Sequence, residues 1–130
     1  MREVVRTERA PAAVGPYSQA VICGGFVWAS GQIGTDPATG TLVEGEIEDE
    51  TRQVLANLAA VLEAAGTGMD SVVRATVYLT DLGHFDRVNR VYAAAFPADA
   101  PPARVCVQVS RLPRGARVEI DAVARAAPVS

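Results

Sequence analysis

Two short segments near the C-terminus alternate strictly between apolar and polar side chains. In residues 103–109 the odd positions are apolar, and the even positions are Arg104, Cys106 and Gln108. In residues 117–122 the parity is inverted, and Glu119 is one of the polar positions. A period of two is typical of β-strands that bury one face. We therefore predict that each of the two segments is a β-strand with one buried face.

The residues between the two segments favour a turn. Residues 112–115 read Leu-Pro-Arg-Gly, and proline and glycine are the strongest turn formers. A turn here predicts that the two strands lie side by side. Arg104 and Glu119 are then expected to be neighbours on one face of the sheet.

Length and composition indicate one domain over residues 1–130, of which 49% are hydrophobic. The formal net charge is -3, so the surface offers no general attraction to phosphate backbones or anionic membranes. We therefore expect a small-molecule partner, no nucleic acid and no membrane. The charged first ten residues lack the apolar core of a secretory signal, and no later run reaches membrane-spanning length, which predicts a cytoplasmic protein.

The basic residues are all arginine, because the sequence contains no lysine. Without a lysine amine, the chain cannot form a Schiff base with a carbonyl substrate or anchor pyridoxal phosphate. The single histidine, His84, has no nearby Cys or His with which to bind a metal. Cys23 and Cys106 do not form a disulfide or zinc pattern, and we expect free thiols. These observations predict neither a metal nor a cofactor.

Hydrophobic periodicity predicts helices in residues 48–65 and 83–96. Strands are predicted around them, in residues 2–6, 18–22, 26–30, 72–80, 103–109 and 117–122. This order favours an α+β fold with a mostly antiparallel or mixed sheet and both helices on one face. The opposite face is then left for a neighbouring subunit to cover.

Turn and cap residues mark the ends of these elements. Gly24 and Gly25 predict a tight hairpin, Gly66 can end the first helix, and Asp81 can cap the second. Residues 31–40 are rich in turn formers and predict a surface loop.

Several polar residues are candidates for a site. Arg104 fits either a structural salt bridge or a clamp for a substrate carboxylate, and in the second case Glu119 is free to orient or deprotonate a water. Cys106 is more simply a small buried residue than a nucleophile, because no histidine is placed to activate it. Other candidates have an equally plain structural interpretation: Tyr17 at the rim of a pocket, Ser30 and Gly31 at a strand end, and Asn89 within the second helix.

Three stretches of the chain resemble the RidA (YjgF) family. They are residues 10–19 (Ala-Pro-Ala-Ala-Val-Gly-Pro-Tyr-Ser-Gln), residues 29–33 (Ala-Ser-Gly-Gln-Ile) and residues 102–113 with Val118, Glu119 and Ile120 after them. Shorter matches lie at Asn57-Leu58 and Val88-Asn89. The resemblance implies a chorismate mutase-like α+β fold, assembled as a homotrimer with a central barrel and clefts between subunits. It also implies hydrolysis of 2-imino acids, such as 2-iminobutanoate and 2-iminopropanoate, to 2-keto acids and ammonia.

The resemblance also implies roles for six residues. Arg104 would bind the substrate carboxylate, Glu119 would position or activate water, and the backbone at Cys106 would contact the reacting end. Tyr17, Ser30 and Gly31 would line the cleft from the adjacent chain. Val105 stands where close relatives often carry serine, and we expect its side chain to face the core. Two other functions remain open: an endoribonuclease or translation inhibitor, and a non-catalytic metabolite-binding or chaperone-like trimer.

Overall fold

The computed structural model describes residues 1–128 and contains one six-stranded sheet and two α-helices in that range. The strands and helices follow the predicted order, and most of their ends fall within three residues of the predicted ones. They are β1 (Glu3–Val5), β2 (Ala20–Cys23), β3 (Phe26–Gln32), α1 (Ile47–Ala64), β4 (Val72–Leu79), α2 (Phe85–Ala94), β5 (Ala103–Gln108) and β6 (Val118–Arg125).

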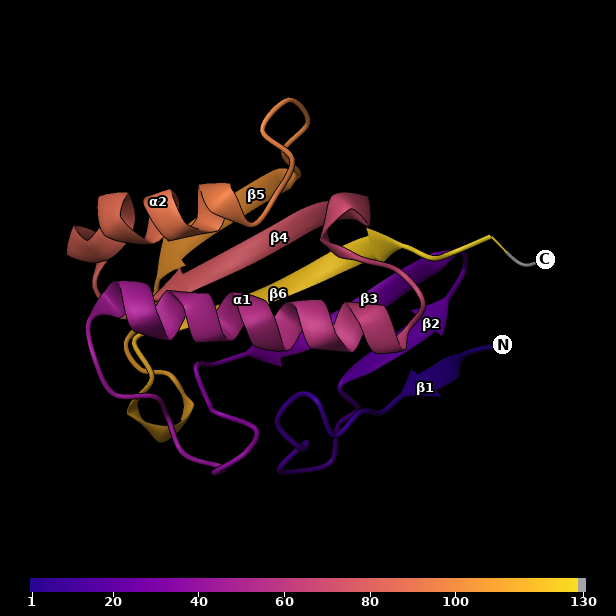
Figure 1. Cartoon of the computed structure of the whole chain (residues 1–130), viewed down its shortest axis with the longest axis horizontal. Coiled ribbons are helices and arrows are strands. Elements are labelled where there is room, and N and C mark those ends of the chain that lie inside the picture. The colour runs from indigo at the N-terminus through magenta and orange to yellow at the C-terminus, as the bar shows by residue number, and fades with distance from the viewer. Residues whose placement is uncertain (129–130) are drawn as a thin grey trace.

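The sheet is mixed, with the strand order β1-β2-β3-β6-β4-β5. All neighbouring strands are antiparallel except β4 and β5, which are parallel. Both helices lie on the same face of the sheet, as Figure 1 shows. The predicted α+β fold class, with two helices on one face, is therefore confirmed. In the described part of the chain, neither helix has the length and apolar character needed to cross a membrane.

Glycines end the elements where the sequence predicts it. Gly24 and Gly25 take φ angles of 65° and 83° between β2 and β3, a backbone region that is costly for other residues. Gly66 follows α1 with a φ of 84°. The Asp81 side chain accepts a hydrogen bond of 2.8 Å from the Gly83 amide, which caps the short turn that leads into α2.

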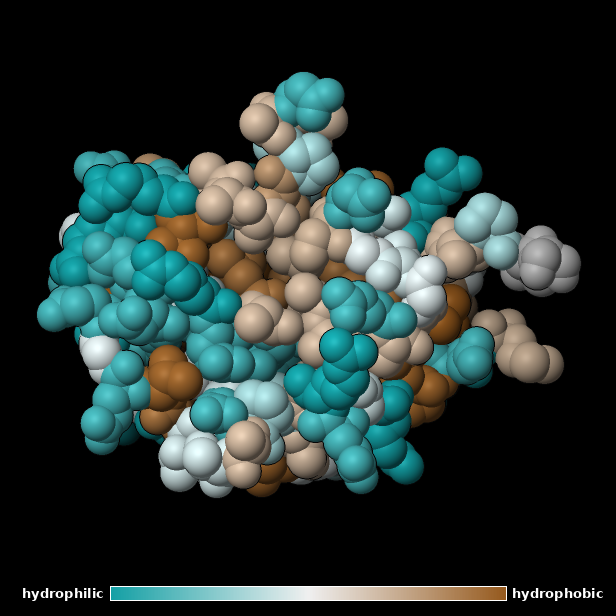
Figure 2. All heavy atoms as spheres, viewed as in Figure 1, coloured by the Kyte–Doolittle hydropathy of each residue, from teal (hydrophilic) through white to brown (hydrophobic). Residues whose placement is uncertain are grey.

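The core lies between α1, α2 and the covered face of the sheet. Leu58 and Leu62 of α1 pack with Val77 of β4 and Ile120 of β6, and all four are fully buried. Burying such side chains stabilises a fold by about 1.5 to 3 kcal/mol each. Towards solvent, an apolar strip lies in the groove between α1 and α2 (Figure 2).

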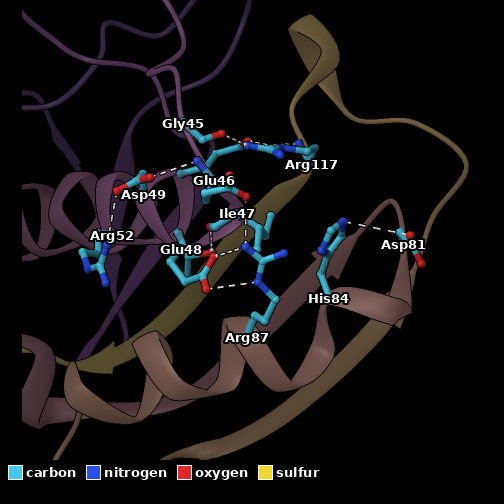
Figure 3. Close-up of polar contacts among 12 residues, drawn as sticks. Gly45, Glu46, Ile47, Glu48, Asp49, Arg52, Asp81, His84, Arg87 and Arg117 are labelled. Atoms are coloured by element: carbon cyan, nitrogen blue, oxygen red, sulfur yellow. Dashed lines mark hydrogen bonds and ion pairs between the residues drawn. The ribbon is translucent and has the colours of Figure 1, made fainter.

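Arginines connect the N-terminal end of α1 to its surroundings (Figure 3). Arg87 of α2 donates hydrogen bonds of 2.7 and 3.0 Å to Glu48 and one of 3.1 Å to Glu46. Arg117, just before β6, donates from its backbone and its Nε to the buried carboxylate of Glu50, each at 2.7 Å. These bonds fix α2 and the start of β6 against one end of α1.

The loop after β3 is partly buried, so the prediction of a surface loop is wrong for its first half. Gly34 and Thr35 are buried beside α1. The Asn57 amide of α1 donates 3.0 Å and 2.8 Å hydrogen bonds to the carbonyls of Ile33 and Thr35. Gly34 packs so closely that a Cβ there would lie 2.8 Å from Cγ of Glu50. A buried side chain therefore satisfies the loop backbone, which turn residues alone do not reveal.

We predict that Asn57→Ala lowers the free energy of unfolding by about 2 to 3 kcal/mol, because two carbonyls lose their donor in a buried site. Urea denaturation measures this change. Gln53→Ala is the matched control: it removes only the bond that Gln53 donates to Asn57, and we expect a change below about 0.5 kcal/mol. Equal, small effects of the two substitutions would contradict the anchoring role of Asn57.

Candidate functional site

The strands that carry Arg104 and Glu119 are not neighbours, so the predicted hairpin between them is wrong. β4 lies between β5 and β6 and pairs with both. Residues 109–117 therefore connect two strands that are separated by a third. Proline and glycine at 112–115 favour a local turn, and such a turn occurs in a longer connection as well as in a tight hairpin.

Arg104 and Glu119 also lie on opposite faces of the sheet. Arg104 is aligned with Ala75, which is buried on the face that the helices cover. Glu119 is aligned with Tyr78, on the open face. The prediction that Arg104 and Glu119 share a face is wrong, because the apolar side of β5 faces away from the helices. Val105 is accordingly 37% exposed rather than turned towards the core.

Three residues of α2 surround the Arg104 side chain and form what we call the Arg104 cradle: Phe85, Asn89 and Tyr92. Their spacing of four and three residues places them on one side of the helix. The guanidinium donates a 2.6 Å hydrogen bond from Nη1 to Oδ1 of Asn89. Its central carbon lies 5.5 Å and 4.9 Å from the ring centroids of Phe85 and Tyr92, within the range of cation–π attraction.

No charged partner neutralises Arg104. In residues 1–128 the guanidinium forms no ion pair with a carboxylate, so the salt-bridge interpretation is not supported. Burial raises the pKa of the Tyr92 hydroxyl despite the nearby arginine, which keeps that group neutral. The cradle thus holds a cation in place with neutral groups and leaves its charge available to an anion.

Cys106 lies on the same side of β5 as Arg104 and packs against the core. Neither Cys106 nor Cys23 forms a disulfide within residues 1–128. Burial raises the pKa of the Cys106 thiol, and the charge of Arg104 only partly opposes this effect. A thiol with a raised pKa is a weak nucleophile at neutral pH.

On the other face, a cavity of about 360 Å³ collects four of the predicted residues. We call it the Glu119 cavity; its lining residues are Tyr17, Ser30, Gly31, Ile33, Pro113 and Glu119. The structure brings together residues that are up to about a hundred positions apart in sequence. Arg104 and Cys106 do not line this cavity.

A bulge in β3 shapes this cavity. Ser30 and Gly31 occupy the interval in which the pairing of β3 with β6 shifts register. Ser30 is held by a 2.6 Å hydrogen bond from its hydroxyl to the Ser18 carbonyl. At Gly31 a Cβ would lie 2.5 Å from Oε2 of Glu119, so a larger residue there would displace the carboxylate from its present position. Bulges of this kind often occur beside active sites, where they redirect backbone and side chains.

The Glu119 carboxylate is half-buried and binds its proton more tightly than an ordinary glutamate. Burial is the main cause of the raised pKa, and the negative charge of Asp121 adds to it. Asp121 in turn accepts a 2.9 Å hydrogen bond from the Tyr78 hydroxyl. A carboxylate with a raised pKa is suited to exchanging protons with a substrate or a water near neutral pH.

Other chemistry has less support in the described residues. Across residues 1–128, no three His, Cys, Asp or Glu side chains are arranged to hold a metal ion. Sequence analysis did not identify Phe85 and Tyr92 as partners of Arg104, because at their positions an apolar helix face explains them equally well. Asn89, Ile33 and Pro113 lie within the segments that resemble the RidA family, but their residue types alone indicate only a polar helix residue and two loop residues.

Comparison with known proteins identifies the family of this chain. Residues 7–126 match the family model described as Endoribonuclease L-PSP, which is the RidA (YjgF) family. This chain belongs to that family. The RidA resemblance drawn from residues 10–19, 29–33 and 102–113 is therefore confirmed.

Three relatives illustrate the likeness. A RutC family protein of Pyrococcus horikoshii is 52% identical over 95% of this chain and 98% of its own length. The 2-iminobutanoate/2-iminopropanoate deaminase of Bos taurus is 46% identical over 100% of this chain and 94% of its own length. The crystal structure of E. coli TdcF with bound serine matches with a TM-score of 0.90 at 39% identity, over 96% of this chain and 99% of that one.

We predict that Glu119→Gln raises the thermal stability of this RidA-family protein at neutral pH. Because the pKa of Glu119 is higher in the folded than in the unfolded chain, the wild-type protein loses stability as pH rises between those two values. The melting temperatures of the two proteins should converge below the unfolded pKa and separate above the folded one. Glu8→Gln, at an exposed position, is the control and should show no such separation. If the melting temperatures of wild type and Glu119→Gln differed by the same amount at every pH, the raised pKa would be contradicted.

Proposed function

We propose that this protein hydrolyses 2-imino acids, such as 2-iminobutanoate and 2-iminopropanoate, to 2-keto acids and ammonia. One observation carries the proposal: the chain holds an arginine that has no acidic partner within residues 1–128 and, separately, a half-buried glutamate with a raised pKa in a cavity. Arginine matches a carboxylate with its rigid fork of donors, and glutamate can exchange protons with water. A 2-imino acid presents a carboxylate next to an electrophilic C=N carbon, and needs both groups.

The proposed reaction uses only water and side chains that this protein supplies. Water attacks the imine carbon while Glu119 accepts its proton, and a C–O bond forms as the C=N double bond becomes single. Glu119 then returns the proton to nitrogen, which completes a carbinolamine. The hydroxyl of this intermediate passes its proton to the same nitrogen by way of Glu119, the C–N bond breaks, and ammonia leaves as the carbonyl forms. The imine is already electrophilic, so this route proceeds without a lysine amine, and Arg104 orients the substrate throughout.

We further propose that each site is shared between two chains of a homotrimer. Within one chain, Arg104 and Glu119 are two strand spacings apart across the sheet, about 10 Å, are offset by a further three residues along β4, and lie on opposite faces. One small substrate cannot touch both. Arg104 and the backbone at Cys106 would come from one chain, and the Glu119 cavity, with Tyr17, Ser30 and Gly31, from its neighbour.

The open face of the sheet supports such an assembly. Phe26 and Trp28 on β3 are 39% and 51% exposed, and Val105 and Val107 on β5 are each 37% exposed. Apolar side chains gathered on one exposed face are typical of a surface that another protein covers. A second copy would bury this face and bring β5 of one chain towards the Glu119 cavity of another.

The names of two relatives agree with the proposal. The Bos taurus relative is named for the reaction proposed here. E. coli TdcF is described with bound serine, and serine carries a carboxylate beside an α-nitrogen, as a 2-imino acid does. The alternative is an endoribonuclease, which the description of the family model suggests. A net charge of -3 favours the imino acid over a polyanion.

We predict that Arg104→Ala reduces kcat/KM for 2-iminobutanoate at least about 100-fold, because two charge-assisted hydrogen bonds to the carboxylate are lost. The substrate is made in situ by an amino-acid oxidase, and hydrolysis competes with a trapping amine. Arg90→Ala, an exposed arginine that lines the groove between α1 and α2, is the matched control. Wild-type activity in Arg104→Ala would exclude the clamp, and no activity in the wild type together with RNA cleavage would favour the endoribonuclease.

A second prediction tests the shared site. Arg104→Ala and Glu119→Gln chains are each inactive alone, but co-expression should restore about a quarter of wild-type activity, because one ordered pair of chains in four carries both intact groups. The control pairs Arg104→Ala with the double variant, which leaves no intact Arg104 and should stay inactive. A site contained in one chain predicts no recovery in either mixture.

A further inference from the structure

A second cavity adjoins the Glu119 cavity and differs from it in charge. It has a volume of about 380 Å³ and shares four lining residues with the Glu119 cavity, namely Tyr17, Gly31, Ile33 and Pro113. A ligand group that extends from the Glu119 cavity along these shared walls therefore enters the second one. We call it the Arg114 cavity, because Arg114 is the one charged residue among those described that line it.

Apart from the exposed Tyr17, the other polar side chains that line the Arg114 cavity are buried. Gln19 is engaged with the backbone of Thr7 and Pro11, and Gln32 and Thr35 are buried. Most of the remaining lining is apolar, including Pro11, Val14 and Ile33. The cavity thus suits an aliphatic chain that ends in an anionic group.

Arg114 has an unusual backbone conformation. Its φ and ψ are 58° and 21°, and it is the one non-glycine residue with a positive φ in the described part of the chain. Glycine or asparagine adopts this conformation at lower cost, which makes an arginine at this position a candidate functional residue. Nη1 donates a 2.9 Å hydrogen bond to the Gly40 carbonyl, which fixes the guanidinium, while Nε and Nη2 have no acceptor within residues 1–128.

We infer that the Arg114 cavity binds the side-chain carboxylate of dicarboxylic 2-imino acids, such as the imine of glutamate, an inference that rests on the proposed function. The substrate's first carboxylate binds Arg104 of one chain. Its C=N carbon lies over Glu119 of the neighbour, and its second carboxylate meets the free donors of Arg114 in that same neighbour. The terminal charge of the substrate is therefore selected by the chain that supplies Glu119.

The test compares two substrates of equal carbon number that differ in terminal charge, the imines of glutamate and norvaline, each made in situ by a matching oxidase. We expect Arg114→Gln to lower the ratio of their kcat/KM values, glutamate imine over norvaline imine, about tenfold or more. Arg114→Lys should recover part of the ratio, because it keeps the charge but not the fork. Arg111→Gln, an exposed arginine outside this cavity, should leave the ratio unchanged.

An unchanged ratio in Arg114→Gln would overturn the inference, whatever the effect on both rates together. Such a parallel loss would mean that Arg114 only fastens the loop at Gly40. Failure of the proposed function is recognised separately, because the wild type would then hydrolyse neither imine. In that case, calorimetric binding of 2-oxoglutarate and 2-oxopentanoate to wild type and Arg114→Gln decides the inference without turnover: equal discrimination by both proteins would reject it.

Discussion

The parallel pairing of β5 with β4 determines where both charged groups of the candidate site lie. Parallel neighbours need a crossover connection, and here α2 supplies it. The crossover places α2 over the same face as Arg104, so that Phe85, Asn89 and Tyr92 meet the guanidinium. The same pairing inserts β4 between β5 and β6 and separates Arg104 from Glu119. One feature of topology therefore creates the cradle and divides the site in two.

The composition of the cradle matters as much as its position. A carboxylate beside Arg104 would hold the guanidinium firmly, but it would also compete with an anionic ligand for the same donors. An amide oxygen and two aromatic faces fix the side chain without neutralising it. Two carboxylates of α1 are engaged with other arginines: Glu48 with Arg87, and Glu50 with Arg117.

The sequence predicts the elements well and their arrangement less well, for a physical reason. Alternation correctly groups Arg104 with Cys106 and Glu119 with Asp121, because it reports which side chains of one strand share a side. Alternation carries no information on which strands are neighbours in the sheet, so it does not reveal that β4 lies between β5 and β6. The importance of Asn89 depends on Arg104, fifteen positions further on, and no local pattern connects them. Tyr17, Ser30 and Gly31 were assigned through family resemblance, since their local sequence explains each as an ordinary loop or strand residue.

The features that are energetically unfavourable in an isolated chain lie on the open face and at one edge of the sheet. A half-buried carboxylate with a raised pKa, two exposed aromatic residues and two exposed valines lie on the open face, whereas the helix-covered face is well packed. β5 is an edge strand, whose outer backbone groups pair with nothing in residues 1–128. Arg104 sits on this edge, beside α2, where a neighbouring chain can reach it. In the proposed assembly, the contact that covers the open face is thus the same contact that brings Arg104 to a carboxylate held over Glu119.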